Sequence, residues 1–279
     1  METMTYLKRI FCTIVVLLGS YLVYLYTHRE FNPDAFAHAI VQHERFPLSP
    51  ASLSPNELKA ILSQKFSYLG FGKQMTVYES EDHNYVIKFF NPRPPLRKTR
   101  FQSLRKIKYF CSLKWFSEAY FKKKTRLHKL FQRHALAFNE LRDETALVYL
   151  HLNASTAPDV ELHIVDKSGT LYILDPQSVP FVLQKKAILA SDFLHSLSDP
   201  QHAYTALHTL FASRARKHFT DRIQTLHNNY GFINGQAVQL DFGRIKKDEA
   251  LDEDKELTRI FHSLQKSWPI FREQVEDNP

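Results

Sequence analysis

Cysteine is scarce in this chain, which has only Cys12 and Cys111 among its 279 residues. Two cysteines are too few for the disulfide framework that holds small secreted domains together, and they leave the redox compartment undetermined. The fold must therefore depend on a hydrophobic core. With 44% hydrophobic and 24% charged residues, the chain is long enough to build one bilobed domain or two small ones.

Long apolar runs are also rare, and the one candidate lies near the N-terminus. Residues 10–26 form a run of 17 residues without a charge, which is at the short end for a membrane-spanning helix. Tyrosines in the second half of this run suit the interfacial region of a bilayer. We therefore expect a short flank at residues 1–9 and a single-pass membrane anchor at residues 10–26, whose orientation the flanking charges barely specify.

Two other interpretations of residues 10–26 stay open. A cleaved signal peptide requires small residues at a cleavage site before a polar mature start, whereas Gly19 and Ser20 are followed by more apolar residues. A helix buried in a soluble core would also be apolar. The anchor is the preferred interpretation because of the length of the run, so a membrane is the first partner that we expect.

The next segment, residues 27–54, has the composition of a tether. It contains a short amphipathic piece followed by prolines among serines. Ser54, Pro55 and Glu57 form a capping box with proline at the first helical position. The sequence therefore predicts a helix from Pro55, where the folded domain begins.

Two glycines and a lysine mark the following strands. Gly70 and Gly72 lie one residue apart before the β-branched Val77, which predicts a strand, a glycine-lined turn and a returning strand. Paired glycines allow backbone N–H groups to approach phosphate oxygens. The next strand, residues 85–90, carries Lys88 among apolar neighbours. A buried ammonium group is costly when unpaired, so Lys88 needs an acidic partner or a phosphate.

A second hairpin is predicted near the C-terminus. Asn234-Gly235 is a sequence that forms tight hairpin turns, so the strands on either side should bring Asn229 and Asp241 together. An amide oxygen and a carboxylate at neighbouring strand ends suit Mg²⁺, which prefers oxygen ligands and keeps waters or phosphates in its other positions. Asn229 and Asp241 are therefore candidate metal ligands.

Acidic residues are almost absent from residues 93–133, which hold 14 Lys or Arg and one acid, a charge of about +13 in a chain whose total is +8. Aromatic residues are interleaved with these charges. In a chain with an N-terminal anchor this pattern favours binding to anionic lipid. Nucleic acid is a second candidate partner, and a solvated helix whose aromatics pack on the folded domain is the third interpretation.

Taken in order, these motifs resemble the protein-kinase-like superfamily. The matches to its glycine-rich loop are Gly70, Gly72 and Val77, with Met75 in place of the third glycine; Lys88 matches its strand lysine, and Asp241-Phe242-Gly243 matches its D-F-G. The resemblance covers about two thirds of the chain. It implies an α+β bilobed fold and binding of ATP and Mg²⁺, with Lys88 on the phosphates.

The implied fold has a small antiparallel sheet in an N-lobe at residues 55–183, with the basic helical insertion at residues 93–133. A mostly helical, shortened C-lobe follows at residues 184–279. The connection between lobes, whose backbone meets an adenine ring in this superfamily, would lie around Gln184 to Lys186. A shorter first lobe would move that connection to Asp175-Pro176.

The superfamily also requires a glutamate on a helix to pair with the lysine. Residues 126–152 have a helical pattern, and Glu144 lies on the same face as the apolar residues that follow it. Glu144 is the preferred partner of Lys88, and Glu140 is the alternative. Both could also be surface acids paired with neighbouring basic residues.

The resemblance fails where catalysis would need it. The proton-accepting aspartate should lie five residues before Asn229, at a position that holds Gln224. Asp221 is the nearest acid, and His227 is another candidate for handling a proton. No Ala-Pro-Glu element follows Gly243. We therefore expect either a divergent phosphotransferase with a small-molecule or lipid acceptor or, slightly preferred, a nucleotide-sensing pseudokinase.

A function of a different class stays open. The chain would then be a non-enzymatic, membrane-associated adaptor that uses residues 93–133 to bind anionic lipid or nucleic acid, with the kinase-like core as a scaffold. The two hypotheses differ in one geometric respect. Only the first requires Lys88, Glu144 and Asp241 to converge within one cleft.

Overall fold

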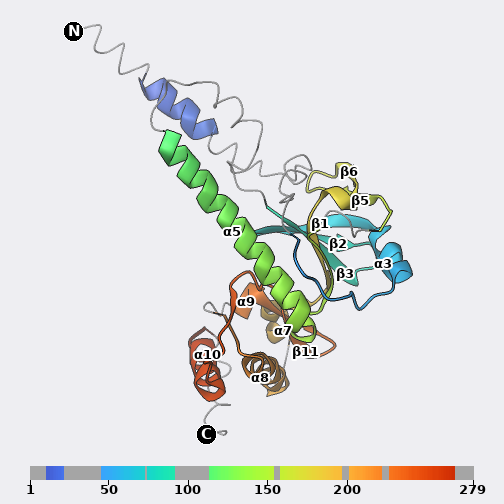
Figure 1. Cartoon of the computed structure of the whole chain (residues 1–279), viewed down its shortest axis with the longest axis vertical. Helices are drawn as coiled ribbons and strands as arrows, with labels where there is room; N and C mark the ends of the chain where they lie inside the picture. Colours follow the sequence, from blue (N-terminus) through green and yellow to red (C-terminus); the bar gives the residue numbers. More distant parts are fainter. Residues whose placement is uncertain are drawn as a thin grey trace, which may run out of the picture. The chain divides into compact units, whose positions relative to one another are not determined.

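The computed structural model describes residues 11–21, 45–72, 74–91, 113–153, 158–196, 201–221 and 226–267 (Figure 1). The chain divides into two compact units, residues 1–32 and 33–279. In the first unit residues 11–21 are helical, and the rest of the predicted anchor lies outside the described residues. Among the described residues, no helix has both the length and the apolar character needed to cross a membrane.

The second unit opens with the helix that its capping pattern predicts. Helix α3 (Pro55–Leu62) begins after Ser54, whose side chain accepts a hydrogen bond from the Glu57 backbone while the Glu57 carboxylate accepts one from the Ser54 backbone. Before α3, Phe46 is buried, and its backbone N–H donates to the side chain of Asn153 at 3.0 Å. Part of the segment interpreted as a tether is thus packed on the folded unit.

A seven-stranded sheet follows, in the order β4-β7-β3-β2-β1-β5-β6. Its strands are β1 (Lys65–Phe71), β2 (Met75–Ser80), β3 (Tyr85–Phe90), β4 (Leu147–His151), β5 (Leu162–Val165), β6 (Leu171–Leu174) and β7 (Phe181–Lys185). Neighbouring strands are antiparallel except β1 and β5, which are parallel. The sheet is larger than the small one that the sequence predicts, but the α+β class is confirmed.

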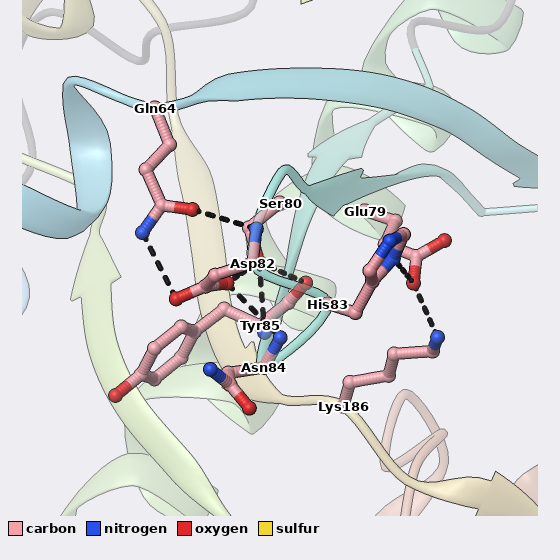
Figure 2. Close-up of polar contacts among 8 residues, drawn as sticks. All are labelled: Gln64, Glu79, Ser80, Asp82, His83, Asn84, Tyr85 and Lys186. Atoms are coloured by element: carbon pink, nitrogen blue, oxygen red, sulfur yellow. Dashed lines mark hydrogen bonds and ion pairs between the residues drawn. The ribbon is translucent and has the colours of Figure 1, made fainter.

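The turn between β2 and β3 is held by its own polar side chains (Figure 2). Asp82 accepts hydrogen bonds from the Ser80 hydroxyl at 2.6 Å, from the Asn84 backbone at 3.0 Å and from the Gln64 side chain at 3.1 Å. Burial raises the pKa of Asp82, but these hydrogen bonds together lower it to about 2. The turn therefore depends on an ionised carboxylate.

The helix predicted at residues 126–152 is in fact three elements. Helix α5 (Leu113–Glu140) ends before the short helix α6 (Arg142–Thr145), Ala146 has a positive φ of 53°, and β4 follows. Every residue of β4 is buried. Because a fully buried strand has no alternation of polar and apolar residues, periodicity alone does not separate it from a buried helix.

The remaining elements are mostly helical, and Figure 1 shows α7, α8 and α10 gathered apart from the seven-stranded sheet. They are η1 (Pro176–Ser178), β8 (Ile188–Leu189), α7 (Ala190–His195), α8 (Gln201–Arg216), β9 (Phe219–Asp221), α9 (Leu226–Asn229), β10 (Tyr230–Ile233), β11 (Gln236–Gln239), β12 (Ile245–Lys247) and α10 (Glu253–Ser267). Strands β8, β10 and β11 form a small sheet, and β9 pairs with β12.

Two hydrophobic clusters stabilise these parts. One joins α5 to β3, β4 and β7 and includes Phe90, Phe131 and Phe242. The other joins α8, α10 and β10 around Phe211 and Phe232. Phe242, which follows Asp241, thus packs in the same cluster as α5 although more than a hundred residues separate them. This packing brings the predicted site together.

Candidate nucleotide site

Lys88 lies at the centre of the site. Its strand β3 is paired on one side with β2 and on the other with β7, and the side chain of Lys88 is 9% exposed. The Lys88 ammonium donates a hydrogen bond of 2.9 Å to the carbonyl of Leu240, the residue before Asp241. β3 therefore converges with the end of the second hairpin, as the first hypothesis requires, but Glu144, the third residue expected in this cleft, lies elsewhere.

The electrostatic state of Lys88 reflects this burial. Burial lowers the pKa of Lys88 to about 8, and the charge of Asp241 opposes that decrease. In the described part of the chain, the Leu240 carbonyl is the one hydrogen-bond acceptor of the ammonium group. An ammonium group has three N–H donors, so Lys88 has capacity to bind an anionic ligand.

The second hairpin has the predicted register and turn. Strands β10 and β11 pair from Tyr230 opposite Gln239 to Ile233 opposite Gln236, and Asn234 and Gly235 have the positive φ values of 49° and 80°. The end of β11 therefore lies beside the start of β10, as the Asn-Gly signal predicts.

Asn229 and Asp241 lie at neighbouring ends of this hairpin. The Asn229 carbonyl accepts hydrogen bonds from the backbone N–H groups of Leu240 at 2.6 Å and Asp241 at 3.3 Å. Asp241 is exposed, and one of its carboxylate oxygens accepts a 2.9 Å bond from the Gly243 N–H. The predicted proximity of the two residues is confirmed.

The oxygen atoms of the Asp241 carboxylate and the Asn229 amide suit a hard cation whose other positions are filled by a bound phosphate and by waters. The described residues contain no group of three or more His, Cys, Asp or Glu residues placed to hold a metal. Mg²⁺ commonly uses one or two carboxylates together with waters and substrate phosphates. The exposed carboxylate of Asp241 with the side chain of Asn229 matches that requirement in chemistry.

The hairpin between β1 and β2, which contains Gly70 and Gly72 and is called the glycine hairpin, is held by hydrogen bonds from the end of β3. The Gly72 N–H donates to the Met75 carbonyl at 2.8 Å, and Gly70 lies opposite Val77 at an irregularity in the β1–β2 register. Asn91 donates from its side chain to the Gly72 carbonyl at 2.9 Å and from its backbone to the Gln74 carbonyl at 2.7 Å. Sequence analysis missed Asn91, whose only signal is an amide directly after a strand.

The tip of this hairpin reaches the turn that follows Asp241. A Cβ atom added to Gly243 would lie 2.1 Å from the amide oxygen of Gln74. Such a distance is far below van der Waals contact, so a Cβ atom at residue 243 would force the end of the flexible Gln74 side chain to move. The glycine hairpin and the D-F-G-like turn therefore meet directly.

The pairing predicted between Glu144 and Lys88 is wrong. Glu144 is 4% exposed, and its carboxylate accepts hydrogen bonds of 2.6 Å from Lys217 and from Ser213. Because the chain leaves α5 after residue 140, Glu144 lies on α6 and faces α8 instead of β3. The alternative, Glu140, pairs with Lys247 at 2.8 Å.

The connection after β7 differs from the prediction in detail. Gln184 is buried within β7, and its side-chain amide donates to the Thr145 carbonyl and, at 3.3 Å, to the Gln239 carbonyl. It therefore links β7 to the second hairpin and does not lie in the connection itself. The alternative position, Asp175-Pro176, precedes and begins η1 between two strands of the same sheet, so it is excluded as the connection between lobes.

The segment that follows β7 is attached to the β2–β3 turn (Figure 2). Lys186 donates from its ammonium to the Glu79 carboxylate and from its backbone N–H to the Asn84 carbonyl at 2.8 Å. The same Glu79 oxygen lies 2.6 Å from a ring nitrogen of His83. This attachment fixes the start of the connection.

Asp221 is placed in the interior. It is 1% exposed, and its carboxylate accepts a 3.0 Å hydrogen bond from the Gln239 side chain. Gln239 in turn accepts a bond from the fully buried Arg214 at 2.9 Å. Asp221 thus belongs to a buried polar network, which gives a structural reason for its identity. His227 is exposed on α9, and Gln224 lies outside the described residues.

Comparisons with known proteins add little to this geometry. No family model matches the chain, and no curated protein matches it. A solved structure of WbdD with the kinase inhibitor LY294002 is 14% identical, with a TM-score of 0.39 over 76% of this chain and 41% of that one. A structure of the bifunctional kinase-methyltransferase WbdD is 16% identical, with a TM-score of 0.37 over 79% and 38%.

The apo form of PpkA-294 is 13% identical, with a TM-score of 0.34 over 71% of this chain and 61% of that one. The chain thus spans between about two fifths and three fifths of the length of the chains in these three structures. Likenesses this distant carry no argument about activity. The described residues thus establish an α+β architecture with a seven-stranded sheet.

Proposed function

We propose that this chain is a kinase-like protein that binds ATP and Mg²⁺ between the seven-stranded sheet and the β10–β11 hairpin. One observation carries the proposal. The buried ammonium of Lys88 donates to the carbonyl of Leu240, next to the exposed carboxylate of Asp241. A cation with its pKa lowered by burial, beside a candidate metal ligand, is the arrangement that a polyphosphate would stabilise.

The other residues have defined parts in this proposal. Lys88 contacts the phosphates, and the hairpin that contains Gly70 and Gly72 covers them. Asp241 and Asn229 hold the metal, which would neutralise phosphate charge when bound. Gln184 supports the site by joining β7 to the second hairpin. The adenine ring would be contacted by the backbone of the segment that follows β7 and not by Gln184.

A nucleotide-sensing pseudokinase is preferred to an active phosphotransferase. Asp221, the nearest acid to the expected catalytic position, is buried and bonded to Gln239. Glu144, the expected partner of Lys88, is bonded to Lys217 instead. If phosphate transfer is measured, a small molecule or a lipid is the expected acceptor. A group other than Asp221 would then accept the proton of the acceptor.

The proposal is tested by thermal denaturation of the full chain with and without ATP and Mg²⁺. ATP at 100 times its dissociation constant should add about 2.7 kcal/mol to the free energy of unfolding. Lys88→Met and Asp241→Asn should reduce that gain, whereas Lys59→Met, which changes an exposed lysine on α3, should not. Equal midpoints for the wild-type chain with and without ATP would contradict the proposal.

Association with a membrane remains part of the proposal. It is supported by the uncharged run at residues 10–26 and by the charge of about +13 at residues 93–133. Sedimentation with vesicles that contain anionic lipid, at low and high salt, tests the basic segment, because screening should release a chain bound through its lysines. If the chain binds vesicles but not ATP, the adaptor hypothesis replaces the kinase-like function.

A further inference from the structure

Strand β6 is the open edge of the seven-stranded sheet. It comes last in the strand order, next to β5, and in the part of the chain that the structure describes no strand lies on its outer side. Every residue of β4, the strand at the opposite edge, is buried, whereas Leu171 and Ile173 of β6 are 52% and 56% exposed. Figure 1 shows β5 and β6 at an end of the sheet away from α7, α8 and α10. The outer side of β6 is therefore accessible to another chain.

The register of β5 with β6 determines which backbone groups of β6 point outward. The Asp166 N–H donates to the Thr170 carbonyl at 3.0 Å, just before the two strands begin to pair. Because hydrogen-bonded and non-hydrogen-bonded pairs alternate along an antiparallel ladder, Tyr172 directs its backbone N–H and C=O toward β5. Leu171 and Ile173, on either side of it, therefore direct their N–H and C=O groups away from the sheet.

The edge strand lacks the features that prevent edges from pairing. Natural edge strands are commonly protected by charged side chains, by proline, by a β-bulge or by a covering element. Residues Leu171–Leu174 include no charged residue and no proline, and they pair with β5 in an unbroken register. An edge with outward backbone groups and exposed apolar side chains is a template for the addition of another strand.

The two ends of the β5–β6 hairpin carry opposite charges. Glu161 directly precedes β5 and Asp175 directly follows β6, so these exposed acids lie at one end of the hairpin. Lys167, which is also exposed, lies in the turn at the other end. An added strand that runs antiparallel to β6 and carries the same charges would place its basic end beside the two acids, and its acidic end beside Lys167. A second copy of β6 meets this requirement.

We propose that the chain pairs with a second copy of itself through β6, antiparallel and centred on Tyr172. A two-fold axis then relates the two copies, as in most closed dimers. Leu171 lies opposite the partner's Ile173, and the outward N–H and C=O groups of these residues bond across the join. Residues directly opposite each other share a face of the sheet, so the exposed apolar side chains of both copies cover one another. The proposal does not depend on the nucleotide site, because β2, β1 and β5 separate β6 from the strand of Lys88.

Sedimentation equilibrium of the full chain in a mild detergent measures this association. The protein concentration should reach about 1 mM, because a contact of a few side chains gives a weak dimer. Ile173→Pro removes the outward N–H without removing a bond to β5, since an edge strand tolerates proline where the N–H faces solvent, and it should weaken the dimer by about tenfold or more. Leu171→Lys, which places like charges together at an exposed position, should weaken it similarly and serves if the proline variant does not fold. Leu69→Ala, which removes an exposed apolar side chain from β1, is the matched control and should change the dissociation constant by less than about twofold.

Disulfide trapping tests the register. In a chain with Cys12→Ser and Cys111→Ser, Tyr172→Cys places two thiols across the two-fold axis, where the Cα atoms of a non-hydrogen-bonded pair are about 4.5 Å apart and a disulfide can form. Thr170→Cys in the same background places its two thiols four residues apart along the join, about 13 Å, which is too far for a disulfide. Mild oxidation should therefore link the Tyr172→Cys chains into dimers and leave the Thr170→Cys chains as monomers.

Several results would overturn the proposal. A wild-type chain that is monomeric at every concentration would do so, and so would a dimer that Ile173→Pro and Leu171→Lys leave unchanged. Equal trapping of the Tyr172→Cys and Thr170→Cys chains would show that the proposed register is wrong. A monomeric chain that binds a synthetic peptide of alternating valine and lysine, and loses that binding in Leu171→Lys, would assign the edge to a basic partner instead of a second copy.

Discussion

Lys88 should make the stability of this protein depend on pH in the alkaline range. Burial lowers the pKa of Lys88 from 10.5 to about 8. Between these two values the unfolded chain keeps the proton and the folded chain releases it, so the unfolded state binds more protons and stability rises with pH. Lys88→Met lacks this titration while keeping most of the apolar volume of the side chain.

The magnitude follows from the size of the shift. One pKa unit corresponds to ~1.4 kcal/mol, so the free energy of unfolding of wild type should gain roughly 1–3 kcal/mol relative to Lys88→Met between about pH 7 and pH 10. The absolute difference between the two proteins is not the test, because the substitution also removes the hydrogen bond to the Leu240 carbonyl. Only its change with pH reports on the buried ammonium.

Urea denaturation of both proteins at several pH values measures this change. Other lysines and tyrosines titrate in both proteins and cancel in the comparison. Lys59→Met, which changes an exposed lysine, provides the control. Its free energy of unfolding should differ from that of wild type by an amount that does not vary with pH. If the difference in free energy of unfolding between wild type and Lys88→Met is equally constant with pH, Lys88 is not a buried ammonium group at the proposed site.

Three further predictions concern packing and ion pairs. Gly243→Ala should lower the free energy of unfolding by about 0.5–1.5 kcal/mol, because its Cβ atom would push the Gln74 side chain into another rotamer, and Gln74→Ala should recover that loss in urea denaturation. Glu144→Gln should lower the free energy of unfolding by about 1–3 kcal/mol in thermal denaturation, because Lys217 loses its buried partner. The same substitution in a Lys217→Met background should cost less, and an equal cost in the two backgrounds would contradict this prediction. The lowered pKa of Asp82 supplies stability above about pH 4 that is lost as pH falls toward about 2. Asp82→Asn should therefore be less stable than wild type by about 1 kcal/mol at neutral pH and equal to it in strong acid. Urea denaturation at each pH measures this difference.

Local signals in the sequence predicted the elements that depend on few residues. The capping box placed the start of α3, and Asn234-Gly235 placed the turn that returns Asp241 to Asn229. In each case one or two backbone positions determine the structure. The convergence of Lys88 with Asp241 was also expected from the resemblance, but the acidic partner that the resemblance implied for Lys88, Glu144, is bonded to Lys217 instead.

The errors arose where long-range packing decides the outcome. The apolar run at residues 147–151 became β4 because β7 offers it a partner, and this shortened the helix that was expected to carry Glu144 toward Lys88. Asn91 was missed because it belongs to no motif. It acts on the tip of the glycine hairpin, 19 residues earlier in the sequence.

A structure of the full chain with a non-hydrolysable ATP analogue and Mg²⁺ would show whether Lys88 and Asp241 bind the nucleotide and its metal. We predict phosphate oxygens within about 3 Å of the Lys88 ammonium and a cation bound by Asp241 and Asn229. An analogue bound elsewhere on the chain, with Lys88 still bonded only to the Leu240 carbonyl, would contradict the account.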